Sequence, residues 1–216
     1  WNGDGTGSGV FQAPHGRRLG AGPAVVQPKP DSASRRVVIV DRTEWAYGID
    51  PDGAVAWSKR VRTGHVRGGV SVAGRDAGRQ QLLFGGDTHR LYSATPDGNI
   101  RWVLSNRGDM KGSVEAGDVD GDGRAEVFSA AGRPMGSDHA AGEMLCLNDS
   151  GRVVWSFPTP RAMRGDPTLA DLDGDGAYEV VFADWGGNVF ALDARTGREH
   201  WRSEIGTDVR RCFAVA

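Results

Sequence analysis

Two short acidic segments carry the residue types that bind a hard metal ion. Residues 171–179 (DLDGDGAYE) place carboxylates at positions 1, 3, 5 and 9 and a glycine at position 6, and residues 118–126 (DVDGDGRAE) repeat the pattern. Four carboxylates on one tight loop repel each other strongly unless a cation lies between them. A ligand set made of oxygen atoms suits Ca²⁺, and an acidic turn without an ion is the alternative. The predicted ligands are the side chains of Asp118, Asp120, Asp122, Glu126, Asp171, Asp173, Asp175 and Glu179, with the backbone carbonyls of Arg124 and Ala177 at position 7.

An EF-hand loop shares positions 1 to 6 of this pattern but requires a bidentate glutamate at position 12. Position 12 is Ser129 in one segment and Phe182 in the other. Each segment continues into a β-branched and aromatic run, EVF or EVVF, which predicts a strand and not a helix. The acidic segments are therefore predicted to be loops that join two strands. Gly123 and Gly176 fit the sharp turn, where a positive φ favours glycine.

The composition limits the classes of protein to which the chain can belong. With 216 residues and a formal net charge of −2, the chain can bury a sizeable core and has no charge excess for nucleic acid or a membrane surface. No apolar run approaches the length of a membrane span, so none is predicted in this segment. Cys146 and Cys212 are too few for a disulfide scaffold and are expected to be small apolar residues in strands.

An internal repeat organises most of the chain. Four tryptophans recur at spacings of 45, 53 and 46 residues, and each lies four residues after a glycine. A short apolar segment with a small residue at its third position precedes each glycine. The tryptophans are Trp57, Trp102, Trp155 and Trp201, and the small residues are Gly48, Ser93, Cys146 and Ala191. Each unit reads as four short antiparallel strands without a helical period, which is typical of a β-propeller blade.

We therefore predict an all-β fold, a β-propeller built from four-stranded antiparallel blades. About four complete blades of a ring of six to eight are expected, at residues 22–66, 67–111, 112–165 and 166–210 of a single domain fragment that spans 1–216. Residues 1–21 and 211–216 are expected to be partial units, because each matches part of the repeat. Asn2 and Asp4 occupy positions 3 and 5 of a degenerate acidic loop, and whether they belong to a third metal loop stays open.

Two related repeat families resemble these residues. The acidic segments, each followed by a strand, are similar to the FG-GAP/VCBS repeat, which is known for calcium loops in integrin-α-like propellers. Residues 191–201 (ALDARTGREHW) resemble the tryptophan-docking motif of PQQ-like, or quinoprotein-type, propellers. That resemblance covers about residues 22–216 and implies that each tryptophan locks neighbouring blades together. The chain lacks the vicinal Cys-Cys pair of the quinone-binding alcohol dehydrogenases of that family, so Ca²⁺ and not PQQ is the expected cofactor.

A basic residue precedes the first strand of each unit, and in a propeller that strand lines the central channel. These residues therefore predict an arc of cations on the face opposite the acidic loops, suited to a carboxylate or a uronic acid. Pairing of each cation with a neighbouring acid is the alternative. The residues are Arg67, Lys111, Arg164 and Arg210, and an insertion on the same face adds Arg133, Asp138 and His139.

These features favour a binding module over an enzyme, and no catalytic residue is assigned. We expect a calcium-stabilised propeller of bacterial type, extracellular or periplasmic, that binds a carbohydrate, a small anionic ligand or a protein. A nucleic acid partner is not expected. A PQQ-dependent dehydrogenase and a propeller polysaccharide lyase are the enzymatic alternatives.

Overall fold

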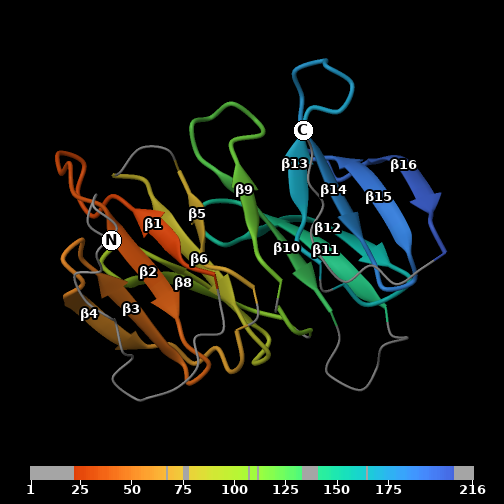
Figure 1. Ribbon diagram of the computed structural model, residues 1–216. Coiled ribbons are helices and arrows are strands. Elements are labelled where there is room, and N and C mark those ends of the chain that lie inside the picture. The colour runs from red at the N-terminus through yellow and green to blue at the C-terminus, as the bar shows by residue number, and fades with distance from the viewer. Residues whose placement is uncertain are drawn as a thin grey trace, which may run out of the picture.

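Sixteen strands in the described part of the chain form four antiparallel sheets, which follow one another in chain order (Figure 1). The computed structural model describes residues 22–66, 68–74, 78–106, 108–110, 112–132, 141–163 and 165–206. Within these ranges no residue is helical. The predicted all-β organisation in four-stranded antiparallel sheets is confirmed.

Each sheet is one blade with its strands in sequence order. Blade 1 holds β1 (Ala24–Val26), β2 (Arg36–Val40), β3 (Trp45–Ile49) and β4 (Val55–Arg60). Blade 2 holds β5 (Ser71–Ala73), β6 (Gln81–Gly85), β7 (Arg90–Ala94) and β8 (Ile100–Ser105). Blade 3 holds β9 (Glu115–Gly117), β10 (Glu126–Ala131), β11 (Gly142–Leu147) and β12 (Val153–Thr159). Blade 4 holds β13 (Thr168–Ala170), β14 (Glu179–Ala183), β15 (Asn188–Asp193) and β16 (Glu199–Glu204).

The blades converge along their short first strands, because β1, β5, β9 and β13 contact one another in series. Side-chain hydroxyls tie the starts of these strands together. Gly69 N donates to Ser113 Oγ at 3.0 Å, and Val114 N donates to Ser71 Oγ at 3.3 Å. The first strand of each blade is therefore its inner strand.

Most of the hydrophobic core lies between neighbouring blades, in three clusters that each combine side chains of two blades, and two smaller clusters lie within blades 1 and 4. On β10, Val127 and Ala131 pack toward blade 2 in one cluster, whereas Phe128 and Ala130 pack toward blade 4 in another. This alternation is the two-residue period of a strand, applied to a sheet that is covered on both faces. A strand in that position reads as a continuous apolar run, as VVIV of β2 and VVFA of β14 do.

A meander places the turns after its first and third strands at the same edge of the sheet. Ion pairs confirm this geometry, because Arg36 at the start of β2 contacts Asp50 in the β3–β4 turn at 2.9 Å. The same guanidinium reaches Asp97 in the corresponding turn of blade 2, also at 2.9 Å. We call this edge of the molecule the acidic-loop face, because both acidic segments are turns between a first and a second strand. The turns after the second and fourth strands form the opposite face.

The small residue at the third position of each apolar segment lies opposite the tryptophan of its own blade. Gly48, Ser93 and Cys146 lie directly across the sheet from Trp57, Trp102 and Trp155, and Ala191 lies across from Trp201. A small side chain at this site leaves room for the neighbouring indole. Each of the four strand pairs also shifts register immediately after the small residue.

The described residues form no helix that is long and apolar enough to cross a membrane.

Candidate metal centres and the surfaces beside them

The two acidic segments are loops that join an inner strand to the second strand of its blade. Acidic loop 1 (residues 118–126) joins β9 to β10, and acidic loop 2 (residues 171–179) joins β13 to β14. In each loop the carboxylates at positions 1, 3 and 9 offer oxygen atoms that all lie within 4.8 Å of one another. They are Asp118, Asp120 and Glu126 in the first loop, and Asp171, Asp173 and Glu179 in the second. Three converging carboxylates form a donor set that fits Ca²⁺.

The same hydrogen bonds shape both loops. The carboxylate at position 1 accepts two backbone N–H groups through its two oxygens, from positions 4 and 6, at 2.8–3.0 Å. The glutamate at position 9 reaches back to the N–H of position 2, at 3.2 Å in loop 1 and 2.8 Å in loop 2. Backbone N–H groups at positions 5 and 7 donate to the carboxylates at positions 3 and 5. Two sequences that differ at positions 2, 7 and 8 thus fold into one loop geometry.

Glycine is required twice in each loop. The backbone has a φ of 82° at Gly121 and 81° at Gly123 in loop 1, and 79° at Gly174 and 89° at Gly176 in loop 2. Side chains rarely adopt this conformation. The glycine at position 6 was predicted from the sequence, whereas the equal role of position 4 was not, although the GDG pattern of both segments could have suggested it.

The carboxylates at position 5 lie outside the two groups of converging oxygens. Asp122 accepts the Arg124 N–H at 2.7 Å, and Asp175 accepts the Ala177 N–H at 2.8 Å. Coordination by position 5, and by the carbonyls of position 7, stays a prediction.

Burial disfavours the charged form of Glu126 in acidic loop 1. The pKa of Glu126 is raised, chiefly by desolvation, and the Val119 N–H offsets part of this effect. The charges of Asp120, Asp122 and Asp118 raise the pKa of Glu126 further. A bound cation would remove this repulsion, since the carboxylates face a common centre. In acidic loop 2 the glutamate is 2 % exposed, and His200 Nδ1 lies 3.7 Å from its Oε1, a contact that the sequence did not suggest.

Acidic loop 1 is also tied to both neighbouring turns. Arg79 of blade 2 donates from Nη1 to the carbonyl of Gly123 at 2.9 Å, so one blade contacts the loop of the next. Arg124 pairs with Asp149 in the β11–β12 turn at 3.1 Å. The carbonyl of Asp149 in turn accepts the indole N–H of Trp102 at 2.9 Å. Loop 1 therefore connects to the contact that joins blades 2 and 3.

The tryptophans of the repeat join consecutive blades. In blades 1, 2 and 3 the indole N–H donates to a carbonyl in the turn between the third and fourth strands of the following blade. The pairs are Trp57 with Pro96 at 3.1 Å, Trp102 with Asp149 at 2.9 Å and Trp155 with Ala194 at 3.0 Å. The glycine of that turn lies against the ring, because a Cβ on Gly197 would come within 2.7 Å of Trp155. Trp201 of blade 4 is 44 % exposed.

A large hollow lies on the acidic-loop face beside loop 1, with a volume of about 880 Å³. Its walls come from blades 2, 3 and 4 and include Arg79, Arg101, Glu115, Leu169 and Tyr178. Burial raises the pKa of Glu115, and the N–H of Ala116, which donates to its Oε1 at 3.1 Å, offsets part of the rise. No local sequence pattern predicts this hollow, because its lining residues come together only when three repeats pack.

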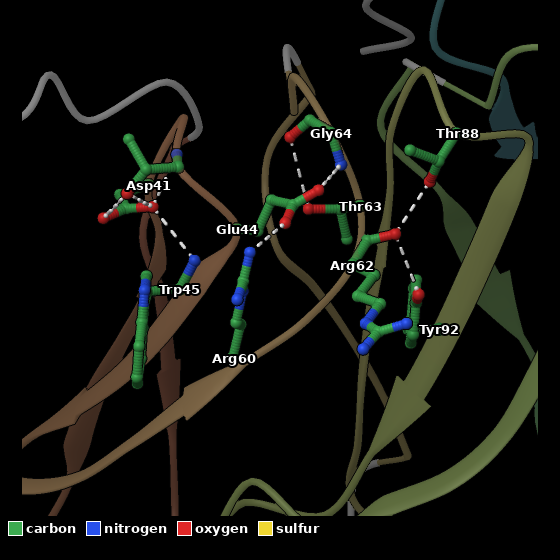
Figure 2. A network of polar contacts seen from close by, with 10 residues as sticks. Asp41, Glu44, Trp45, Arg60, Arg62, Thr63, Gly64, Thr88 and Tyr92 are labelled. Carbon is green, nitrogen blue, oxygen red and sulfur yellow. Dashed lines mark hydrogen bonds and ion pairs between the residues drawn. The ribbon is translucent and has the colours of Figure 1, made fainter.

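A second hollow, of about 630 Å³, lies on the opposite face between blades 1 and 2. Figure 2 shows its polar frame, in which Glu44 contacts Arg60 at 3.3 Å and accepts the Gly64 N–H at 3.3 Å. Beside it the fully buried Asp41 accepts the Trp45 N–H at 3.0 Å. The turn residue Glu44 has a φ of 72°, a left-handed conformation that is uncommon for a residue other than glycine. Asp41 and Glu44 hold the β2–β3 turn and were not singled out in the sequence.

The predicted ligand residues on the opposite face lie outside the described residues. They are Arg67, Lys111, Arg164 and Arg210, with Arg133, Asp138 and His139 of the insertion, and Asn2 and Asp4 of the degenerate acidic loop also lie outside the described residues. Their role stays a prediction.

The four-stranded sheets converge on their inner strands, and tryptophans join each sheet to the next. This arrangement defines a β-propeller. The sequence profile of the PQQ_2 family, described as "Outer membrane protein assembly factor BamB", matches residues 96–211, more than half of the chain. The chain belongs to this family. The likeness of the acidic loops to FG-GAP/VCBS repeats stays a prediction.

Comparisons with individual proteins support the fold. The chain is 41 % identical over 64 residues to the serine/threonine-protein kinase AfsK of Streptomyces griseus, which is 28 % of this chain and 7 % of that protein. The crystal structure of BamB from Moraxella catarrhalis is similar with a TM-score of 0.58 and 20 % identity, over 84 % of this chain and 47 % of that one. Quinohemoprotein alcohol dehydrogenase from Comamonas testosteroni gives a TM-score of 0.60 and 13 % identity, over 87 % and 43 %. The chain thus spans less than half the length of these proteins.

Proposed function

We propose that this chain is a calcium-stabilised propeller that serves as a binding or scaffold module. The observation that carries the proposal is the identical frame of the two acidic loops, each with three carboxylates whose oxygens converge within 4.8 Å. Two loops of different sequence share every backbone-to-carboxylate hydrogen bond. Three carboxylates that converge on one point repel each other, and a bound cation would offset that repulsion.

The ion would act on stability through the folded state. Because the carboxylates converge only when the loop is folded, Ca²⁺ binds the folded chain and shifts the folding equilibrium towards it. In loop 1 this effect extends beyond the loop, since Gly123 and Arg124 connect it to Arg79 and Asp149 of the adjacent turns. Calcium would therefore stabilise the contact between blades 2 and 3.

The partner we propose is a protein, a carbohydrate or a small anionic ligand, and the setting is extracellular or periplasmic. The family description, which names an outer membrane assembly factor, supports a protein partner and that setting. Calcium at extracellular concentrations also suits loops of this kind. We propose that the four described blades belong to a ring of six to eight, in keeping with the share of the longer BamB and dehydrogenase chains that they cover.

A calcium titration of the purified chain tests this function. With 100-fold excess over the dissociation constant, one site stabilises the fold by about 2.7 kcal/mol, which raises the melting temperature by on the order of 5–10 °C relative to EDTA. Calorimetry should give two sites per chain, and Mg²⁺ should substitute poorly because it prefers a smaller octahedral shell. Equal melting temperatures in calcium and in EDTA would refute the proposal.

The enzymatic alternatives stay predictions with their own tests. A quinone-dependent dehydrogenase requires an absorbance change when PQQ and calcium are added, together with dye reduction. A polysaccharide lyase requires depolymerisation of an acidic glycan. Binding of a glycan without cleavage favours the binding module over both.

A further inference from the structure

Two guanidinium groups that line the hollow beside acidic loop 1 form no ion pair with a carboxylate of the described residues. Arg79 is exposed and donates to the Gly123 carbonyl, and no ion pair joins it to a described residue. Arg101, exposed on β8, has neither a hydrogen bond nor an ion pair to any described side chain. Arg124 differs from them, since Asp149 already neutralises it at 3.1 Å. Two guanidiniums that no described carboxylate neutralises line one concave surface and favour an anion, and their planar geometry matches a carboxylate.

The rest of the lining is not that of a site for a bare inorganic ion. Tyr178 is 43 % exposed, and it lines the hollow together with the part-buried Leu169. A half-exposed aromatic ring beside an aliphatic side chain offers an apolar surface. Glu115 adds a part-buried carboxyl that can accept hydrogen bonds from hydroxyl groups. The volume of about 880 Å³ is within the range of pockets for small organic ligands.

We propose that this hollow binds an acidic sugar, with Arg79 and Arg101 holding the carboxylate and Tyr178 covering an apolar face of the ring. A sugar acid has one carboxylate for the arginines, several hydroxyl groups for Glu115 and a C–H face for Tyr178. The site lies on the acidic-loop face, opposite to the arc of cations predicted from the sequence. The inference rests on the proposed function and narrows its ligand class.

Acidic loop 1 makes the site sensitive to calcium. Asp118, Gly123 and Arg124 line the hollow, and the Gly123 carbonyl holds the guanidinium of Arg79. An ion at this loop would neutralise the nearby carboxylates and fix the position of that carbonyl. The bare loop instead presents negative charge to an incoming carboxylate, which weakens its binding.

Calorimetric titration with trigalacturonic acid tests the proposal, with the same trisaccharide as its methyl ester for comparison. We expect binding of the acid in calcium, binding at least tenfold weaker in EDTA, and binding at least tenfold weaker for the ester. Arg101→Gln should weaken binding about 10- to 100-fold, because it removes a charge-assisted contact. Its melting temperature should not change, since the exposed side chain makes no hydrogen bond to the described residues.

Arg90→Gln is the matched control, an exposed arginine at the start of β7 on the opposite face. It should bind like the unaltered chain. No heat of binding with the acid, equal affinity for acid and ester, or equal losses for both variants would overturn the proposal. Binding of an acidic peptide in place of the sugar would overturn the ligand class. Because calcium stabilisation is measured separately, a failure here is distinguishable from a failure of the proposed function.

Discussion

The indole N–H of Trp155 donates a hydrogen bond to the carbonyl of Ala194, 3.0 Å away in the next blade. The ring packs between the strands of its own blade, across from Cys146, and the turn of blade 4. This contact closes the boundary between blades 3 and 4 with one side chain that is both apolar and a donor.

Trp155→Phe should therefore lower the free energy of unfolding by about 1–3 kcal/mol, since it leaves the Ala194 carbonyl without its donor and reduces packing. Trp201→Phe is the control, because that ring is 44 % exposed, and its cost should be smaller. Urea denaturation followed by circular dichroism measures both. A larger loss for Trp201→Phe would contradict the docking role.

The glycine under the ring gives a second test. Gly197→Ala places a Cβ 2.7 Å from the Trp155 ring in a residue with a φ of 72°. Gly53 has the same position in blade 1, a φ of 86° and nothing within 4 Å of its added Cβ. Both variants suffer backbone strain of about 1–2 kcal/mol. Any further loss of unfolding free energy in Gly197→Ala therefore measures the cost of the close contact with the indole. Equal losses in thermal unfolding would show that the close approach carries no cost.

Acidic loop 2 can be tested by removing one carboxylate. Asp173→Asn should abolish the calcium-induced rise in melting temperature that this loop contributes and should have little effect in EDTA, because it removes one of three converging oxygens. The control Asp31→Asn alters an exposed carboxylate outside both loops and should retain the full response. A variant that loses the same stability in calcium and in EDTA would show that Asp173 acts without an ion.

The buried phenol of Tyr47 predicts a loss of stability in strong base. Burial raises the pKa of Tyr47 to about 12, and the charge of Asp41 and a 3.1 Å hydrogen bond to its Oδ2 add to the shift. Since the folded chain holds this proton more tightly than the unfolded chain, the contribution is complete below about pH 10. It is lost as the pH rises through 10 towards about 12. Ultraviolet difference spectra should show a late ionisation that Tyr47→Phe removes, and ionisation of Tyr47 near pH 10 would contradict the burial effect.

Much of the fold was predictable because each repeat is short and strongly patterned. The repeat pattern predicts first strands at residues 24–26, 70–72, 114–116 and 168–170; those of blades 1 and 4 coincide with β1 and β13, and the run at 179–183 is β14. In blades 2 and 3 the inner strands begin one residue later than predicted, at Ser71 and Glu115, which is the usual uncertainty of a three-residue element.

The contacts between repeats were harder to anticipate. The converging oxygens at positions 1, 3 and 9 belong to one loop, so their spacing in the sequence suffices to predict them. The bond from Arg79 to Gly123 depends instead on how two blades pack, and no local pattern encodes it. The hollow lined by Arg101 and Tyr178 needs three blades and is visible only once they are assembled.

The three inter-blade indole contacts all run in the same sense along the chain, from each blade to its successor. The fluorescence of each of these three tryptophans therefore reports on the turn of the following blade. Loosening of the blade 4 turn should change the emission of Trp155 while Trp102 is unaffected, so fluorescence of single-tryptophan variants can map the order in which the blades open. In a chain of repeats coupled to nearest neighbours, this polarity gives the array a direction: disruption of one turn weakens the blade that precedes it.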